Sequence, residues 1–114
     1  MVSPAGRITK FNQKEVDQLF KKSHRILHSP EATILAAPRD KESDLARLLI
    51  VISRAVGNSV ERHLLRRRLK SIFYQQKLFE QLKYDIVIIA KKPIVALDFA
   101  QLSELFLKAI GTIL

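Results

Sequence analysis

The chain has 114 residues, 47% of them hydrophobic, so we expect a single domain with a small core. It carries 20 Lys and Arg against 11 Asp and Glu, a net charge of +9, which favours a nucleic acid or an anionic membrane as partner. There is no cysteine, which excludes disulfides and thiolate chemistry. No apolar run is long enough for a signal peptide or a membrane span, so we expect a cytoplasmic protein.

The first half of the chain predicts one helix followed by three strands. Residues 10–22 form a short amphipathic helix, because Val16, Leu19 and Phe20 recur at helical spacing. Two short strands and a longer one follow, over 25–28, 32–37 and 45–53. Pro38 ends the second strand, and the polar stretch 38–44 predicts a hairpin-type loop. The strand over 45–53 is apolar on both faces at its end, which places it in the centre of the sheet.

The second half predicts helix, strand, helix. Gly57 supplies the turn after the third strand, and Asn58 with Glu61 has the spacing of a capping box. The helix then runs from Ser59 to about Tyr74. A connector over 75–84, a buried strand over 85–90 and an amphipathic helix over 100–110, ended by Gly111, complete the chain.

This order, α-β-β-β-α-β-α, predicts an α+β fold: a single-domain α/β sandwich around a mixed central sheet of about four strands. The helix from Ser59 connects the strand over 45–53 to the strand over 85–90 as a crossover, so those two strands should be parallel. We treat residues 1–114 as one domain, with flexible ends at 1–6 and 111–114.

The most informative segment runs from Arg54 to Lys70. It contains six basic residues and one acidic residue, so it holds +5 of the net charge of +9. At 100° per residue, Arg62, Arg66 and Lys70 share one arc of the helix with Ser59 and His63, and Arg67 flanks it. Arginine forks suit bidentate contact with phosphate, so this arc predicts a polyanion-binding surface. The alternative is a solvated basic face without a partner.

The other side of this helix should pack on the sheet through Leu64, Leu65, Leu69 and Ile72. Arg68 projects toward that apolar side, near Glu61. We therefore interpret Arg68 as a structural arginine with a packed stem and a head close to the carboxylate.

Catalytic constellations are absent from the sequence. His24, His28 and His63 lack the spacing of metal ligands, and no glycine-rich phosphate loop occurs. Asp85 and Asp98 do not form a recognisable acid pair. We predict no catalytic and no metal-binding residue in the chain, and a partner that supplies any chemistry.

The segment over 53–73 resembles the signature of the bacterial ribonuclease P protein component. With x for any residue, that pattern reads basic-x-x-Gly-x-Ala-Val-x-Arg-Asn-x-x-Lys-Arg-x-x-Arg, and it aligns with positions 54–70 of this chain. Arg54 fills the first basic position; Gly57, Val60, Arg62 and Arg67 match; Ser59, Arg66 and Lys70 are conservative replacements; His63 stands in place of Asn. Arg7-Ile8 and the run DIVIIAKKP are also similar to segments of the family, so the likeness covers roughly residues 7 to 110.

The resemblance implies a small protein subunit that binds a catalytic RNA. That RNA, with Mg²⁺ held mainly by the RNA and the substrate, removes the 5′ leader of precursor tRNA. The partners would be the ribonuclease P RNA and precursor tRNA, with no obligate protein partner and no membrane. The resemblance also implies a left-handed crossover through the basic helix. The implied RNA-binding residues are Arg54, Asn58, Ser59, Arg62, His63, Arg66, Arg67 and Lys70.

The family also implies a cleft for the leader between the first helix and the sheet. The residues expected there are Phe20, Lys21, Lys22, Arg25 and Ile34. Val16 and Ile34 stand where aromatic residues are common, so stacking on leader bases would be weaker. We expect Phe20 to be half exposed beside residues 33–35; the alternative is that it anchors the helix to the core.

Two other functions are compatible with the basic chain. A ribosome-associated or other structured-RNA-binding protein would bind RNA without cleavage. A basic surface on anionic lipid is disfavoured because the polar face lacks flanking Trp or Phe anchors on an exposed apolar side.

Overall fold

The computed structural model describes residues 11–39 and 45–113. It contains three main helices and four strands in the predicted order. The elements are α2 (Gln13–Lys22), β1 (His24–His28), β2 (Ala32–Pro38), β3 (Leu48–Val51), α3 (Ser59–Gln75), α4 (Leu78–Gln81), β4 (Tyr84–Ala90) and α5 (Phe99–Ile110), with 3-10 turns η1 (Arg54–Val56) and η2 (Lys92–Ala96). The expected flexible end at 1–6, the Arg7-Ile8 pair and most of the loop over 38–44 lie outside the described residues.

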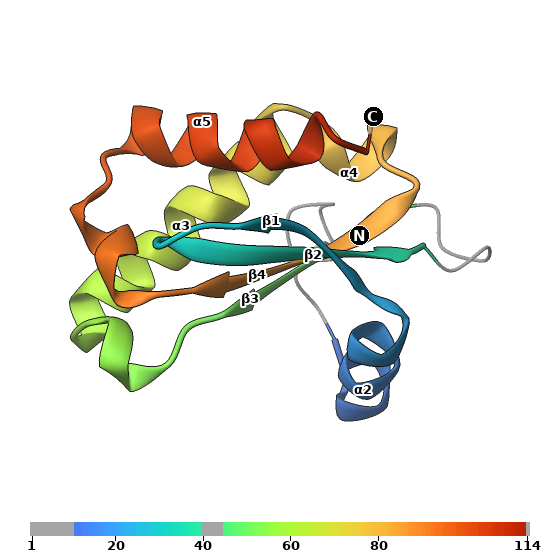
Figure 1. Ribbon diagram of the computed structural model, residues 1–114, viewed down its shortest axis with the longest axis horizontal. Helices are drawn as coiled ribbons and strands as arrows, with labels where there is room; N and C mark the ends of the chain where they lie inside the picture. Colours follow the sequence, from blue (N-terminus) through green and yellow to red (C-terminus); the bar gives the residue numbers. More distant parts are fainter. Residues whose placement is uncertain (1–10, 40–44, 114) are drawn as a thin grey trace, which may run out of the picture.

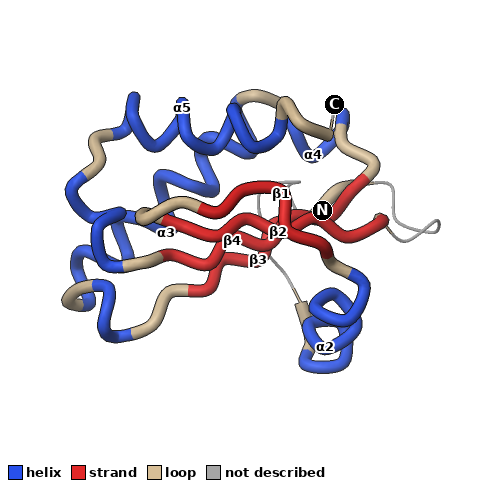
Figure 2. The backbone as a smooth tube through the Cα atoms, viewed as in Figure 1, coloured by secondary structure: helices blue, strands red, loops and turns tan. Residues whose placement is uncertain are grey.

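The four strands form one mixed sheet in the order β1-β2-β4-β3. β2 is antiparallel to both of its neighbours, whereas β3 and β4 are parallel, as the crossover through α3 predicts. α4 and α5 lie on one side of this sheet and α2 lies on the other (Figures 1 and 2). Among the described residues, no helix is long and apolar enough to cross a bilayer.

Two predictions about the third strand are wrong. β3 spans only Leu48–Val51 and lies at the edge of the sheet, because β4 occupies the place between β2 and β3. For the same reason β2 and β3 do not pair as a hairpin, since they are not neighbours in the sheet. The strand is apolar on both faces because Leu48 and Ile50 pack in the main core, whereas Leu49 and Val51 belong to a second, smaller apolar cluster.

Alternation along the strands gives the sheet a closed face and an open face. The closed face carries Ile34, Leu48, Ile86 and Ile88, which pack with α3 and α5 in the main core. Phe73 of α3 and Phe106 of α5 meet there edge to face, with ring centroids 6.2 Å apart. The open face carries a smaller cluster in which only Leu19, Ala37 and Val87 are buried and Phe11, Leu35, Leu49, Val51 and Ile89 are partly exposed.

A β-bulge in β1 changes which side chains reach the open face. Arg25 pairs with Leu35 and His28 pairs with Thr33, and the register shifts between Arg25 and Leu27. Residues three apart in a regular strand point to opposite faces, but the extra residue brings Arg25 and His28 to the same face. Both therefore lie at the β1 edge of the open face.

The start of α3 is built by reciprocal hydrogen bonds. The Asn58 side chain accepts from the Glu61 amide at 2.8 Å, and the Glu61 carboxylate accepts from the Asn58 amide at 3.0 Å, which confirms the capping box. Gly57 is fully extended, with φ 174° and ψ −175°, so its conformation does not require glycine. It is needed for space instead, because a Cβ there would lie 2.9 Å from Glu61 Oε1.

Gly57→Ala should therefore lower the free energy of unfolding by about 1 kcal/mol, the usual cost of losing a helix cap. The new methyl group would push the Glu61 carboxylate away from the Asn58 amide. Gly111→Ala is the matched control, because Gly111 is right-handed (φ −58°) and its added Cβ would meet nothing closer than 3.4 Å. Urea unfolding should show the control to be neutral or slightly stabilising; equal losses in both variants would contradict the spatial role of Gly57.

Candidate RNA-binding surfaces

The basic face of α3 borders a groove beside the edge strand β3. The groove has a volume of about 380 Å³. Its floor and walls are formed by Leu48, Leu49 and Ile50 of β3 and by His63, Arg66, Arg67 and Lys70 of α3. The structure thus brings together four of the residues predicted from the sequence to bind RNA. They place three permanent cations along one side of an apolar strand edge.

The remaining predicted residues lie around the start of α3. Arg54 is exposed on η1, and Ser59 shares a shallow surface with His63 and Arg67. The Asn58 side-chain oxygen is already engaged in the helix cap. Arg62 is half-buried, and its Nε donates to the Gly57 carbonyl at 3.2 Å, so this arginine also supports the turn before the helix.

The apolar side of α3 differs from the prediction at one residue. Leu65, Leu69 and Ile72 are buried, but Leu64 is 41% exposed. Leu64 and Val60, which is 74% exposed, stand beside the basic face. The helix therefore presents a mixed surface in which two aliphatic side chains adjoin His63 and Arg67.

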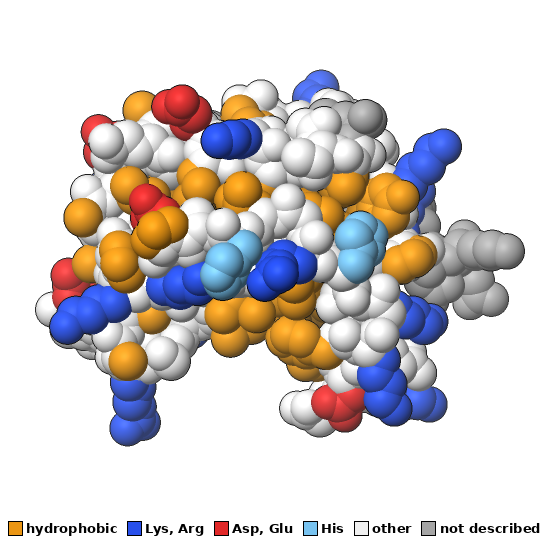
Figure 3. Space-filling view, in the orientation of Figure 1, with side chains coloured by type: hydrophobic (Ala, Val, Ile, Leu, Met, Phe, Trp, Pro, Cys, Tyr) orange, Lys and Arg blue, Asp and Glu red, His pale blue; other side chains and the backbone are white. Residues whose placement is uncertain are grey.

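The open face of the sheet is the second candidate surface. Cross-strand pairing aligns Arg25, Leu35, Val87 and Leu49 in one row, and His28, Thr33, Ile89 and Val51 in the next. Each row begins with a basic or titratable side chain at the β1 edge and ends with aliphatic ones, and Thr33 is the polar member between them in the second row. In Figure 3, Lys, Arg and His side chains cross the middle of the view, where β1 runs in Figure 1, and hydrophobic side chains lie below them next to α2.

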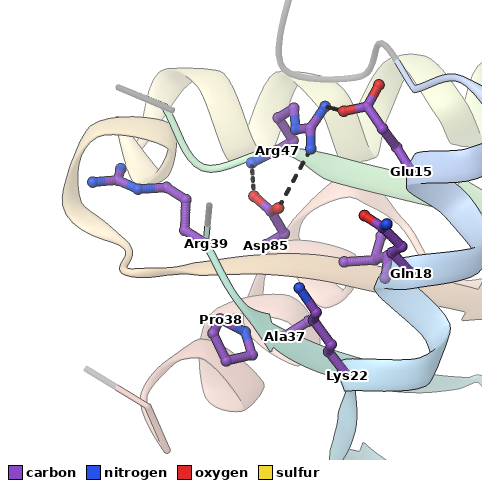
Figure 4. Close-up of a pocket in the computed structure, with 9 residues that line it drawn as sticks. Glu15, Gln18, Lys22, Ala37, Pro38, Arg39, Arg47 and Asp85 are labelled. Carbon is purple, nitrogen blue, oxygen red and sulfur yellow. Dashed lines mark hydrogen bonds and ion pairs between the residues drawn. The ribbon is translucent and has the colours of Figure 1, made fainter. Parts of the chain in front are cut away.

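A cavity of about 350 Å³ separates α2 from one end of this face. One side of α2 lines it with Glu15, Gln18, Leu19 and Lys22, and the sheet side contributes Ala37, Pro38, Arg39, Arg47 and Asp85 (Figure 4). Of the residues expected in a leader cleft, Lys22 lies in this cavity and Arg25 lies on the open face. Phe20 is 40% exposed near the end of α2, and Lys21 is exposed beside it.

The prediction for Ile34 is wrong. Its side chain is completely buried in the main core, on the face covered by the helices. Because successive residues of a strand point to opposite faces, the neighbour Leu35 occupies the open face instead.

Comparisons with known proteins agree with this geometry. The family model described as ribonuclease P matches residues 10–114. The chain belongs to the ribonuclease P protein family. It is 36% identical over 85 residues to the ribonuclease P protein component of Citrifermentans bemidjiense, covering 75% of this chain and 71% of the relative. It is 33% identical over 105 residues to that of a Geobacter species, covering 81% and 90%.

Solved structures of bacterial ribonuclease P proteins share the fold. The Staphylococcus aureus protein matches with a TM-score of 0.79 at 23% identity, covering 92% of this chain and 94% of that one. The Thermotoga maritima protein matches with a TM-score of 0.77 at 24% identity, covering 93% and 97%. The chain is therefore a protein component of the tRNA-processing enzyme ribonuclease P.

Within this ribonuclease P fold, two residues of the open face, His28 and Lys91, were not assigned to it by the sequence analysis. His28 Nδ1 lies 3.0 Å from Thr33 Oγ1, and Lys91 Nζ lies 3.5 Å from the same nitrogen while donating to the Ser29 carbonyl at 2.7 Å. They add a polar corner to the β1 edge. Only the bulge places His28 there, and nothing in the local sequence pattern marks the bulge.

Arg68 adopts the packed position predicted for its stem. It is half-buried and shares a small pocket with Glu61, Leu64, Ile94, Val95 and Leu97. Within the described part of the chain, however, no ion pair connects Arg68 to Glu61, because the Glu61 carboxylate serves the helix cap.

Arg68→Ala should lower the free energy of unfolding by about 1 kcal/mol, since the side chain fills space against Ile94 and Val95. The matched control is Arg66→Ala, which removes the same charge two residues earlier from an exposed position. Thermal and urea unfolding should leave this control within about 0.5 kcal/mol of the parent protein. A larger loss for Arg66→Ala than for Arg68→Ala would reverse the assignment of the two helix sides.

Proposed function

We propose that this protein binds the catalytic RNA of ribonuclease P through α3 and the 5′ leader of precursor tRNA through the open face of the sheet. The observation that carries the proposal is the position of β3 between the two surfaces. Leu49 lines the basic groove and also belongs to the apolar cluster of the open face. One protein can therefore contact both RNAs at once, on either side of a single strand.

The chemistry of the groove suits the RNA subunit. Arg66, Arg67 and Lys70 offer fixed positive charge, and arginine forks engage phosphate in two hydrogen bonds. Release of condensed counterions from the RNA supplies most of the binding free energy of such a surface. His63, in place of the family asparagine, still offers a ring N–H as a hydrogen-bond donor.

The open face suits a short single strand. Its aliphatic rows accept bases without reading their sequence, and Arg25 with Lys91 and Lys22 form a basic rim for the backbone. Phe20 is the aromatic side chain of α2 that is exposed enough to stack on a base.

The cleavage step belongs to the RNA in this proposal. Among the described residues, no cluster of three His, Cys, Asp or Glu side chains could hold a metal ion. Glu15 and Asp85, the two carboxylates in the cavity beside α2, both pair with Arg47, so a metal there would have to displace the guanidinium. In this proposal the Mg²⁺ ions of the endonuclease reaction are held mainly by the RNA subunit and the substrate. The proposal includes a cytoplasmic location, where the protein would meet the RNA subunit and precursor tRNA.

Affinity for the RNA subunit should fall steeply with salt. Arg66→Ala and Lys70→Ala should each flatten the slope of log affinity against log salt by about one unit or less. Lys108→Ala removes the same charge from an exposed position on α5 and should leave the slope unchanged. Filter binding across a salt series makes the comparison; equal flattening by Lys108→Ala would show that net charge, and not the α3 face, controls binding.

Reconstituted cleavage tests the whole proposal. The RNA subunit from the same organism should cleave precursor tRNA better with the protein than without it, and the protein alone should not cleave. Phe20→Ala should weaken binding of a precursor with a leader of about ten nucleotides by about 1–3 kcal/mol, and leave a one-nucleotide leader unaffected. A cleavage rate that does not change when the protein is added would favour a structured-RNA-binding protein of another system. An equal loss on both leaders together with a lower melting temperature would make Phe20 an anchor of the fold.

A further inference from the structure

α2 is attached to the rest of the protein by few apolar contacts. Leu19 is its one buried residue among ten, and the helix stands apart from α3 and α5 on the opposite side of the sheet (Figure 1). Its C-terminal end is tied to β1 through Ser23 alone, so the chain itself holds that end in place. A helix of this length is about 15 Å long, so its N-terminal end needs a separate attachment.

Arg47 provides that attachment. Its side chain forms an ion pair with Glu15 in the first turn of α2, and its guanidinium carbon lies 4.5 Å from the centre of the Phe11 ring, just before the helix. On the other side, its amide donates to Asp85 Oδ1 at 2.8 Å and its Nη2 lies 3.8 Å from Asp85 Oδ2 (Figure 4). One arginine thus connects the start of α2 to the start of the central strand β4.

The anchor is buried where it meets the sheet. Asp85 is only 4% exposed, and the side chain of Arg47 is 20% exposed. Partly buried charges are costly to separate from their partners, so this connection holds its groups in place more firmly than an ion pair on the surface would. Glu15 is held as well, since its Oε1 accepts from the Asn12 amide at 3.3 Å in the cap of α2.

We propose that the Glu15–Arg47–Asp85 connection is a positioning device that sets the angle of α2 to the sheet and so the width of the leader cleft. The cavity between α2 and the sheet has this connection in its lining, together with Gln18, Leu19 and Lys22. The C-terminal end of α2 is fixed at Ser23. If the Glu15–Arg47 ion pair is lost, the N-terminal end can move away from the sheet, and the width of the cavity changes. None of the three residues needs to touch the leader. The inference rests on the proposed function of the open face.

Glu15→Gln is the sharpest variant for a test. Glutamine at the third helical position keeps the capping box but removes the charge that pairs with Arg47. Arg47→Ala is less informative, because it would leave the buried Asp85 carboxylate without its arginine and endanger folding. The matched control is Asp17→Asn, an exposed residue on the same helix that loses the same charge and still accepts from Gln13 Nε2.

The first measurement uses the reconstituted holoenzyme. Glu15→Gln should raise KM about fivefold for a precursor with a leader of about ten nucleotides, with kcat unchanged and with KM for a one-nucleotide leader within about twofold. Asp17→Asn should match the parent protein on both substrates, which removes the effect of added net charge. If the parent protein itself shows no dependence on leader length, the proposed function fails; if it does and the two variants behave alike, the positioning role is wrong.

The second measurement does not depend on activity. The chain has no cysteine, so spin labels can be placed on Lys14→Cys in α2 and Lys108→Cys in α5, both exposed. The distance distribution between the labels should broaden or shift with Glu15→Gln and stay unchanged with Asp17→Asn. An unchanged distribution with Glu15→Gln at an unchanged melting temperature would overturn the proposal.

Discussion

Strand β4 is the constraint on which the other features depend. It is hydrogen-bonded to β2 along one edge and to β3 along the other, and Ile86, Val87 and Ile88 are fully buried. Its alternate side chains point into the two apolar clusters, so the strand supports the helix layer on one face and the open surface on the other. Asp85 at its start also holds Arg47. A defect in β4 would therefore disturb both candidate surfaces and the attachment of α2 together.

Local signals in the sequence were sufficient for the three main helices and for the basic face, although the short helix α4 was predicted only as a connector. The cap at Asn58 and Glu61 needs only residues three apart, and the arc formed by Arg62, Arg66 and Lys70 follows from helical geometry. The crossover between parallel strands was also predictable, because a helix must lie between them. These features depend on spacing along the chain, which the sequence displays directly.

Features that depend on pairing between distant segments were not predictable. β3 is apolar on both sides, which suggests a central strand, but Leu49 and Val51 on one of those sides belong to the partly exposed cluster of the open face. The choice between Ile34 and Leu35 depends on register, and a shift of one residue exchanges the two faces. The Arg47 connection joins residues 15, 47 and 85, which no local pattern relates. The rule that apolar residues are buried fails on the open face, and candidate functional surfaces are where such rules are expected to fail.

The bulge in β1 has a further consequence for a protein with an open apolar surface. β1 is an edge strand, and the free N–H and C=O groups of such a strand are a template on which another chain can add. An extra residue between Arg25 and Leu27 breaks the regular spacing of those groups and increases the local twist. A foreign strand would find no continuous register on that edge. The same residue that turns Arg25 and His28 toward the open face thus protects the sheet against aggregation.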